Sequence, residues 1–167
     1  MAVRRQVVVF KIGAEEFGVD ILLTKEVIVP REITPVPDTE AFVEGVMNLR
    51  GNLLPIIDLR QRLRARATTT QREQRIVIAN IDDRTAGLIV DAASEVIRVT
   101  DDMIEPVPDL ISEMGAGYIE GIINVKDRCI TLIDLQKALS VDVLNELDCV
   151  IEALARHREL PAPARAH

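Results

Sequence analysis

The residues of this chain that could do acid–base chemistry are two aspartates in equivalent contexts. Asp58 stands in LLPIIDLRQRL and Asp134 in CITLIDLQKAL. Two carboxylates that a pseudo-two-fold axis brings together could share one proton and activate water. Alternatively, each caps the helix that follows it, which is worth about 1 kcal/mol. Neither has the small hydroxyl and glycine neighbours of a shared-proton pair, so we favour capping. We expect conversion of either aspartate to asparagine to lower stability modestly and to remove no hydrolytic activity.

The sequence lacks the other patterns that indicate an enzyme. Its two histidines, His157 and His167, both lie near the C-terminal end, and it contains no nucleophile elbow, phosphate-binding loop or cluster with metal-ligand spacing. We therefore predict a non-enzymatic protein without cofactor or metal. Cys129 and Cys149 do not have CxxC spacing, and we interpret both as small buried residues.

The two aspartates belong to a long internal repeat. Residues 42–63 and 118–139 align at an offset of 76 with seven identities in 22 columns. Each copy is preceded by a Glu-Val-Ile triplet and then by Pro-Val-Pro-Asp. An offset this long is too large for a solenoid repeat and indicates a duplicated subdomain. We divide the chain into a first half, 1–74, and a second half, 75–140.

The elements that must position these residues are mostly short strands. Runs rich in β-branched residues predict strands at 3–12, 15–20, 44–50 and 53–58, and a strand pair within 75–91. Short helices should follow the aspartates, at 59–63 and 135–139. Apolar residues at helical spacing predict an amphipathic C-terminal helix within 141–156, with a disordered tail at 157–167. The sequence does not decide whether the N-terminal strands stay with their own half.

These elements predict a mainly β fold of two small barrels. Barrels of this size fill their interiors with side chains, so binding must use outer faces, edges or the groove between the halves.

Composition and charge exclude several classes of partner. The chain has three Phe, one Tyr, no Trp and a net charge of −7, whereas nucleic-acid binding needs stacking aromatics and a basic face. We interpret the six arginines between Arg60 and Arg75 as a solvated linker. No segment is long enough to cross a bilayer and the N-terminal apolar run is too short for a signal peptide, so we expect a cytoplasmic protein that is not inserted in a membrane.

The first repeat copy carries the motifs GVMNLRG and LPIIDLR, preceded by FKIGAEEFGVDI (10–21) and Glu26. Together these motifs resemble the CheW family of bacterial chemotaxis coupling proteins, over residues 6–140. The resemblance implies two SH3-like five-stranded β-barrels related by a pseudo-two-fold axis, with no catalysis. It implies an adaptor that couples the cytoplasmic tip of methyl-accepting chemoreceptors to the regulatory domain of the histidine kinase CheA. The protein would act in a two-component system, in the cytoplasm at membrane-bound receptor arrays.

The resemblance also implies two sets of binding residues. The receptor-binding set would lie in and near the groove between the barrels and comprise Ile21, Glu26, Val27, Asn48, Leu49, Arg50 and Gly51. The kinase-binding set would comprise Leu53 and Leu54 on the outer face of the first barrel, and Glu105, Asp109 and Leu110 after the second Pro-x-Pro.

The residues alone leave alternatives open. Arg50 could be a free contact residue or an internal partner of Glu26. Either Leu53 or Leu54 faces outward, or their strand is buried on both faces. Glu105 and Asp109 could be ordinary solvated loop charges. An adaptor of the same family could serve another array, such as one for pilus-driven motility. A ligand- or nucleic-acid-binding double barrel is disfavoured by the acidic charge and the few aromatics.

Overall fold

A computed structural model of the chain describes residues 4–36, 42–63, 74–81, 83–107, 117–139, 149 and 152. The strands of the first half are β1 (Arg4–Ile12), β2 (Glu15–Asp20), β3 (Thr24–Ile28), β4 (Val43–Leu49) and β5 (Asn52–Asp58). Those of the second half are β6 (Arg75–Ile81), β7 (Arg84–Val90), β8 (Ala92–Thr100), β9 (Ile104–Glu105), β10 (Ile119–Val125) and β11 (Arg128–Ile133). Short helical turns are η1 (Ile21–Leu23), α1 (Leu59–Arg62), η3 (Asp101–Met103) and α3 (Leu135–Ala138).

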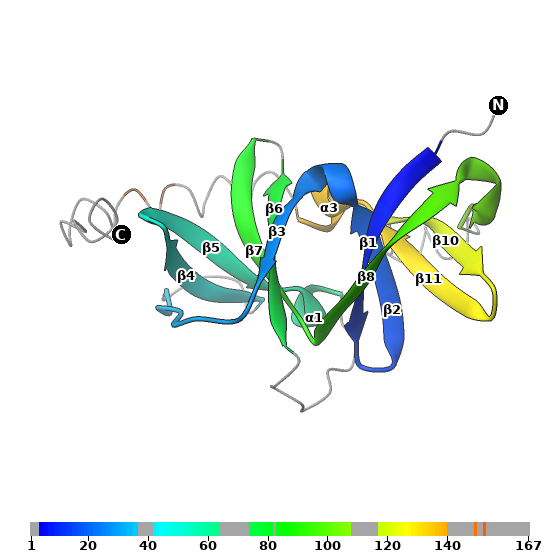
Figure 1. Ribbon diagram of the computed structural model, residues 1–167. Helices are drawn as coiled ribbons and strands as arrows, with labels where there is room; N and C mark the ends of the chain where they lie inside the picture. The colour runs from blue at the N-terminus through cyan, green and yellow to red at the C-terminus, as the bar shows by residue number, and fades with distance from the viewer. Residues whose placement is uncertain are drawn as a thin grey trace.

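The strands form two sheets that lie side by side (Figure 1). One is five-stranded, in the order β3-β6-β7-β5-β4, and the other is six-stranded, in the order β8-β1-β2-β11-β10-β9. The mainly β fold is confirmed. The expected five strands per sheet hold for the first sheet, and the second gains the two-residue strand β9. Closure of each sheet into an SH3-like barrel stays a prediction.

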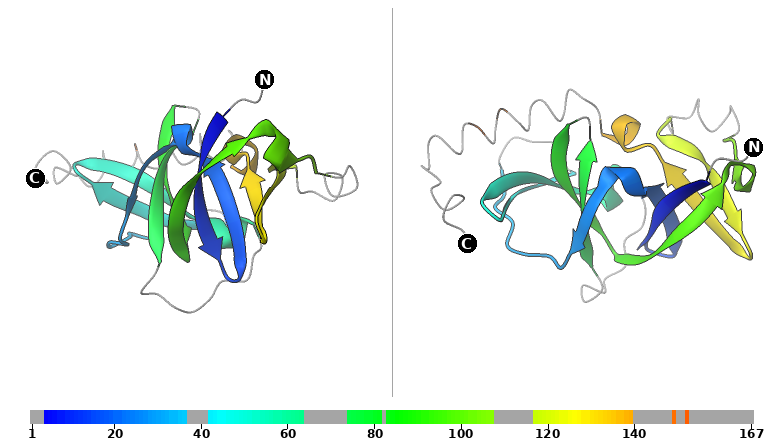
Figure 2. Two further views of the ribbon diagram at one scale, coloured as in Figure 1. Left: turned by 45° about the vertical axis from the view of Figure 1, so that its right-hand side comes forward. Right: turned by 45° about the horizontal axis from the view of Figure 1, so that its top comes forward.

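The two sequence halves exchange their first hairpins, which answers the question that the sequence left open. The β1–β2 hairpin pairs with β8 and with β11, whereas the β6–β7 hairpin pairs with β3 and with β5. The division at residue 74 therefore describes the sequence repeat, while each sheet contains strands from both halves. Figure 2 shows β1 and β2 among the strands of the second half from two further directions.

The end strands of each sheet are consecutive along the chain. After β3, Thr34 bridges back to β4 through two backbone hydrogen bonds with Val46, of 2.8 and 2.9 Å. After β8, the chain turns through η3 and continues as β9, which pairs with β10 at Ile122. Val46 and Ile122 are repeat-equivalent, so the duplication extends to the way in which each sheet bends back on itself.

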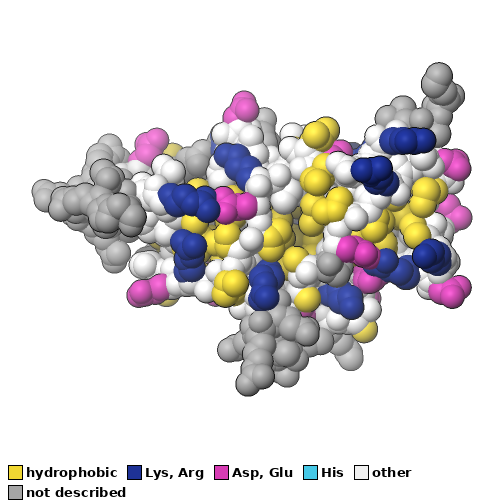
Figure 3. All heavy atoms as spheres, in the orientation of Figure 1, with side chains coloured by type: hydrophobic (Ala, Val, Ile, Leu, Met, Phe, Trp, Pro, Cys, Tyr) yellow, Lys and Arg dark blue, Asp and Glu magenta, His cyan; other side chains and the backbone are white. Residues whose placement is uncertain are grey.

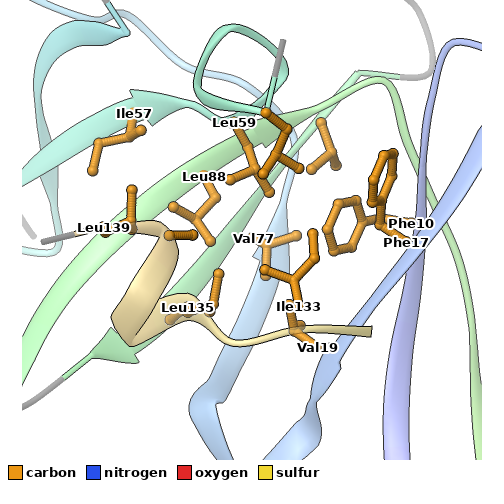
Figure 4. Close-up of a cluster of buried hydrophobic side chains, with 14 of the residues drawn as sticks. Phe10, Phe17, Val19, Ile57, Leu59, Val77, Leu88, Ile133, Leu135 and Leu139 are labelled. Atoms are coloured by element: carbon orange, nitrogen blue, oxygen red, sulfur yellow. The ribbon is translucent and has the colours of Figure 1, made fainter. Parts of the chain in front are cut away.

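Three apolar cores hold the two sheets in the described part of the chain. One lies within the five-stranded sheet around Ile56 and Ile76, and another lies within the six-stranded sheet around Val9 and Ile130. The third and largest fills the space between the sheets, where Phe10 and Val19 meet Val77 and Leu88 (Figure 4). Side chains therefore fill the centre of the region between the two sheets, so a partner can bind only at its surface.

Both sequence-predicted short helices are confirmed, together with their aspartate caps. Asp58 accepts a hydrogen bond from the Arg60 backbone N–H, and Asp134 accepts bonds from the backbone N–H groups of Gln136 and Lys137. The cap residues also have equivalent strand partners, because Asp58 N donates to Phe42 O and Asp134 N to Tyr118 O. Capping is thus the observed role of both aspartates.

Asp58 has a second role that its repeat partner does not share. Its carboxylate, 3% exposed, accepts bonds from Arg60 Nε and Nη2 at 2.8 and 3.0 Å, and Arg60 Nη1 reaches Asp91 at 3.0 Å. Asp91 in turn accepts a 2.6 Å bond from the Gly13 backbone N–H in the β1–β2 turn. This Asp58–Arg60–Asp91 network connects the end of β5 with a turn of the other sheet. Hydrogen bonding to Asp58 first, and then to Asp91, raises the pKa of Arg60.

Several predictions concern segments outside the described residues. These are the arginine-rich linker between α1 and Gln74, the disordered tail and most of the C-terminal helix, of which Cys149 and Glu152 are described with helical backbone. The prediction of buried cysteines was wrong, because Cys129 and Cys149 are both exposed. Cys129 follows Arg128 at the start of β11, where alternation directs its side chain outward.

In the described part of the chain, none of the helices is long and apolar enough to cross a membrane. This part also contains no group of three or more His, Cys, Asp or Glu side chains that could hold a metal ion.

Candidate functional site

The main surface feature of the five-stranded sheet is a groove of about 640 Å³ between the β4–β5 turn, β3 and the β6–β7 turn, here called the β4–β5 groove. Its floor is apolar and its rim carries charges of both signs. Its lining includes Lys25, Glu26, Leu49, Arg50, Leu53, Leu54, Asp83, Arg84 and Glu152. Five of the twelve binding residues expected from the sequence line this one groove. They come from both expected sets, so the structure brings together residues that we assigned to different partners.

An ion pair crosses one edge of the groove. The Arg50 guanidinium donates two hydrogen bonds to the Glu26 carboxylate, of 2.6 and 2.8 Å. This bidentate geometry is the strongest form of such a pair. It shows that Arg50 is the internal partner of Glu26, as one alternative proposed, and yet its side chain stays 64% exposed. Arg50 can therefore exchange Glu26 for a carboxylate of another molecule.

The ion pair should be visible in the titration of Glu26. Hydrogen bonding from Arg50 is the largest influence and holds the pKa of Glu26 below its ordinary value of about 4.3. Because the folded-state pKa is lowered, the pair contributes stability above the unfolded-state pKa and loses it as the pH falls through the folded value. We expect carboxyl-detected NMR to place the midpoint of Glu26 below 4.3.

Replacing Arg50 by alanine should move that midpoint upward. Arg128→Ala, which removes an arginine from the other sheet, is the matched control and should leave it unchanged. If Glu26 has the same midpoint in the Arg50→Ala variant as in the original protein, the Glu26–Arg50 ion pair does not form in solution.

The β4–β5 turn explains why Arg50 stands out from the sheet. Leu49 pairs with Asn52, so the turn has only two residues, Arg50 and Gly51, with φ angles of 49° and 90°. Two positive φ values are typical of the tight type I′ hairpin turn, which glycine favours at its second position. The Asn48 side chain accepts a 3.1 Å bond from the Gly51 N–H. Asn48 and Gly51 thus shape the turn that presents Arg50.

The leucines of the β4–β5 hairpin form the floor of the groove. Leu49 and Leu54 are 6% and 7% exposed and belong to the core of the five-stranded sheet, whereas Leu53 is half-buried. From Leu54 onward every residue of β5 is buried, so the strand is largely buried on both faces. Of the two leucines expected to contact the kinase, only Leu53 keeps substantial exposed surface.

A second surface feature is an exposed apolar band near the junction of the two sheets. Figure 3 shows hydrophobic side chains across the middle of this face, with Lys and Arg on either side. Among the residues that the structure describes, the exposed large hydrophobic ones are Leu22 at 86%, Val27 at 40%, Val29 at 63% and Val96 at 50%. They come from η1, from β3 and the residue after it, and from β8, and we call them the apolar band.

Only one of the four residues in the apolar band was expected from the sequence to lie at a binding surface. Val27 was expected at the binding surface, whereas Leu22, Val29 and Val96 were not. Ile21 was expected there, but its side chain packs partly buried against the core between the sheets. Asp20 caps η1 by accepting from the Leu22 N–H, and this turn directs Ile21 inward and Leu22 outward. The sequence Asp-Ile-Leu-Leu at 20–23 could have predicted this exposed leucine, because a single capped turn of three apolar residues cannot bury all three side chains.

The remaining kinase-binding residues lie elsewhere. Glu105 is exposed on β9 of the six-stranded sheet, opposite Ile122 of β10. It is therefore separated from Leu53 by the division between the sheets. Asp109 and Leu110 lie outside the described residues.

The six-stranded sheet has a counterpart of the groove, lined by the β1–β2 and β10–β11 turns and about 610 Å³ in volume. We call it the β10–β11 groove. Arg128 crosses it, bonded to Glu16 at 3.0 and 3.1 Å and ion-paired with Glu95. Glu95 is the repeat equivalent of Glu26, so each sheet anchors the Glu of its Glu-Val-Ile triplet to an arginine. Its lining has Cys129 and Thr131 at the repeat positions of Leu53 and Pro55, which line the β4–β5 groove.

Comparison with known proteins shows to which family the chain belongs. The family model described as the CheW-like domain matches residues 6–143. The chain is 36% identical over 131 residues to a chemotaxis protein CheW of Rhizobium meliloti, covering 78% of this chain and 84% of that one. It is 33% identical over 146 residues to one of Treponema pallidum, covering 85% and 86%.

A solved structure has the same fold. The crystal structure of the scaffolding protein TtCheW from Thermoanaerobacter tengcongensis superposes with a TM-score of 0.76 at 36% identity, covering 84% of this chain and 91% of that one. The match of the family model and the agreement of fold lead to one conclusion: this chain belongs to the CheW-like domain family.

Proposed function

We propose that the protein is a non-enzymatic adaptor in chemotaxis signalling that couples the cytoplasmic helical hairpin of chemoreceptors to the regulatory domain of the histidine kinase CheA. Family membership supports the coupling role, since the relatives are named as chemotaxis and scaffolding proteins. The two partners come from the resemblance of the motifs. In this role the protein would work in the cytoplasm at membrane-bound receptor arrays.

The observation that carries the proposal is the apolar band. Four large hydrophobic side chains on η1, on β3 and the residue after it, and on β8 are 40–86% exposed, although the described part of the chain buries most of its other large hydrophobic residues in three cores. An exposed apolar stripe with charged borders is the surface on which an amphipathic helix binds. We assign the receptor hairpin to this band, with the nearby Glu26–Arg50 pair supplying polar contacts. In this assignment Ile21 supports η1 from behind, and Asn48, Leu49 and Gly51 hold Arg50 in place.

The kinase domain is assigned to the second set of residues. Leu53 supplies the accessible apolar surface of the β4–β5 hairpin, with Leu54 beneath it. Glu105, with Asp109 and Leu110, supplies the contact on the other sheet. Because Arg50 and Leu53 line one groove, the two partners would meet close to each other, as an adaptor between them requires.

The test of the receptor assignment is a binding titration with a receptor cytoplasmic fragment. Leu22→Glu places a carboxylate in the apolar band, and we expect it to weaken receptor binding about tenfold or more, as the loss of a buried apolar anchor does. Ala14→Glu, at an exposed turn of the six-stranded sheet, is the matched control and should bind normally. Unchanged affinity of the Leu22→Glu variant would overturn the assignment.

The division of the groove between partners has its own test. We expect Arg50→Asp to impair receptor binding and Leu53→Glu to impair CheA binding, each sparing the other partner. Circular dichroism and thermal unfolding should show that both variants remain folded, since both side chains are exposed or half-buried. If Arg50→Asp instead loses CheA binding and keeps normal receptor binding, CheA occupies the whole groove and the receptor binds elsewhere.

A further inference from the structure

We propose that Arg98 of β8 is a further binding residue beside the apolar band, whose guanidinium binds a carboxylate of the amphipathic helix that lies on the band. In the function proposed above, on which this proposal rests, that helix belongs to the receptor hairpin. Arg98 is in neither set of binding residues expected from the sequence.

Arg98 stands on the same face of β8 as Val96, the exposed valine of the band. Side chains two residues apart on a strand point to the same side and are about 7 Å apart. Their cross-strand neighbours on β1 are Gln6, which is exposed, and Val8, which is buried in the core between the sheets. The intervening Ile97 packs instead against the core of the six-stranded sheet. The backbone therefore directs the Arg98 side chain outward, beside the apolar band.

The internal repeat shows that Arg98 interrupts an otherwise duplicated apolar surface. Val27 and Val96 are the central residues of the two Glu-Val-Ile triplets. Val27 pairs with Val77 on β6, a residue of the core between the sheets, and Val96 pairs in the same way with a core valine on β1. Two positions after the central valine, the first copy has the exposed Val29 and the second copy has Arg98. The two halves thus contribute the same apolar surface at the centre, and the second half adds a cation next to it.

The Arg98 guanidinium is available to a partner, in contrast to that of Arg50. Arg50 is already bound to Glu26, so a partner's carboxylate must displace that group. Two acids, Asp101 and Asp102, follow β8 in η3, but no acidic residue among those described forms an ion pair with Arg98. A carboxylate that binds Arg98 therefore displaces water and no acid of the described residues.

The chemistry of Arg98 identifies the matching group on the partner. A guanidinium binds a carboxylate through two parallel hydrogen bonds. Lys and Arg side chains border the hydrophobic stretch of this face on both sides (Figure 3), so the band suits a helix whose apolar side is flanked by acids. Such a helix places its apolar side on Leu22, Val27 and Val96, and a glutamate or aspartate of the adjoining turn on Arg98.

The first test is a titration with the receptor cytoplasmic fragment. We expect Arg98→Gln to weaken binding about threefold at low salt, as the loss of an exposed charge pair does, and less at high salt, because salt screens the pair. The matched control is Lys126→Gln, which removes one positive charge at the exposed repeat position of Arg50 and should bind like the original protein. If Arg98→Gln binds as tightly as Lys126→Gln, Arg98 does not contact the receptor.

The closing experiment replaces the receptor by two synthetic amphipathic helices. Both peptides have the same leucine stripe and differ only in one adjoining turn, which carries glutamates in one peptide and glutamines in the other. We expect the glutamate peptide to bind the original protein about threefold more tightly than the glutamine peptide. This preference should vanish in Arg98→Gln and persist in Lys126→Gln. Backbone amide NMR shifts of residues 22, 27 and 96–98 report the binding. Because the same two peptides are compared on each protein, differences in the helicity of the free peptides cancel.

The two titrations separate Arg98 from the receptor assignment. If the receptor fragment does not bind the original protein, its assignment to the band fails, and the peptide preference still decides the role of Arg98. A glutamate preference that survives in Arg98→Gln overturns that role. The absence of any peptide-induced shift at the band overturns it as well.

Discussion

Replacing Gly45 by alanine should cost the protein about 3–5 kcal/mol of folding free energy, a large part of the stability of a typical domain. Gly45 has a φ of +148°, and a Cβ placed on it would lie 2.1 Å from the Thr34 carbonyl oxygen and 2.7 Å from its carbonyl carbon. These are backbone atoms, so no side-chain rotation relieves the clash. The Thr34 segment would have to move and lose its two hydrogen bonds to Val46, which adds about 1 kcal/mol each to the backbone strain.

The chain provides graded controls for this prediction. At Gly121, the repeat equivalent, an added Cβ meets the Ile104 side chain at 2.6 Å and the Glu105 oxygen at 2.9 Å. Gly121→Ala should therefore be destabilising, but less so than Gly45→Ala. At Gly117 nothing lies within 4 Å, so Gly117→Ala should behave like the original protein. Urea unfolding measures all three, and a Gly45→Ala variant as stable as Gly117→Ala would contradict the close crossing of the Thr34 segment over β4.

The second large effect is expected at Asp58. Asp58→Asn should lower the free energy of unfolding by about 3 kcal/mol, because removing one partner of a buried ion pair leaves the other insufficiently compensated. Arg60, with a side chain 18% exposed, would keep only Asp91 as a charged partner. This replaces our expectation from the sequence of a modest effect, which considered only the helix cap.

Asp134→Asn is the matched control for Asp58. Asp134 caps α3 through the backbone N–H groups of Gln136 and Lys137, and asparagine caps helices about as well as aspartate. We therefore expect a change within about 0.5 kcal/mol. Thermal and chemical unfolding of the two variants under the same conditions would test this. Equal losses of stability would show that the Asp58–Arg60–Asp91 network contributes nothing beyond the cap.

The internal repeat predicts the role that the two aspartates share, but not the additional role of Asp58. Their shared sequence context predicted one shared role, and both do cap short helices. The residue two positions later differs, however, being Arg60 in the first copy and Gln136 in the second. Only the fold brings Asp91 within 3.0 Å of Arg60, so only the first copy acquires a buried charge network. A pair 31 residues apart leaves no pattern in the sequence.

The binding surface shows a similar limit. The motifs pointed to Arg50 and Glu26, and the structure joins them directly through two hydrogen bonds. Leu22, the most exposed large hydrophobic residue among those described, was not expected, because the choice between Ile21 and Leu22 depends on the direction of a single 3-10 turn. Strand periodicity likewise could not show that Leu53 keeps exposed surface while Leu54 joins the core, since that depends on which strands cover β5.

The sequence by itself determined the mainly β class, the duplication, the two capped helices and the family resemblance, because local propensity, turn chemistry and repeated motifs are written in contiguous residues. The tertiary structure alone decided that the halves exchange their first hairpins and that expected receptor and kinase residues share one groove. Each of these outcomes depends on contacts between residues far apart in the chain. Such contacts form because together they bury apolar surface in three cores of the described residues. A local sequence pattern cannot predict how much surface the whole fold buries.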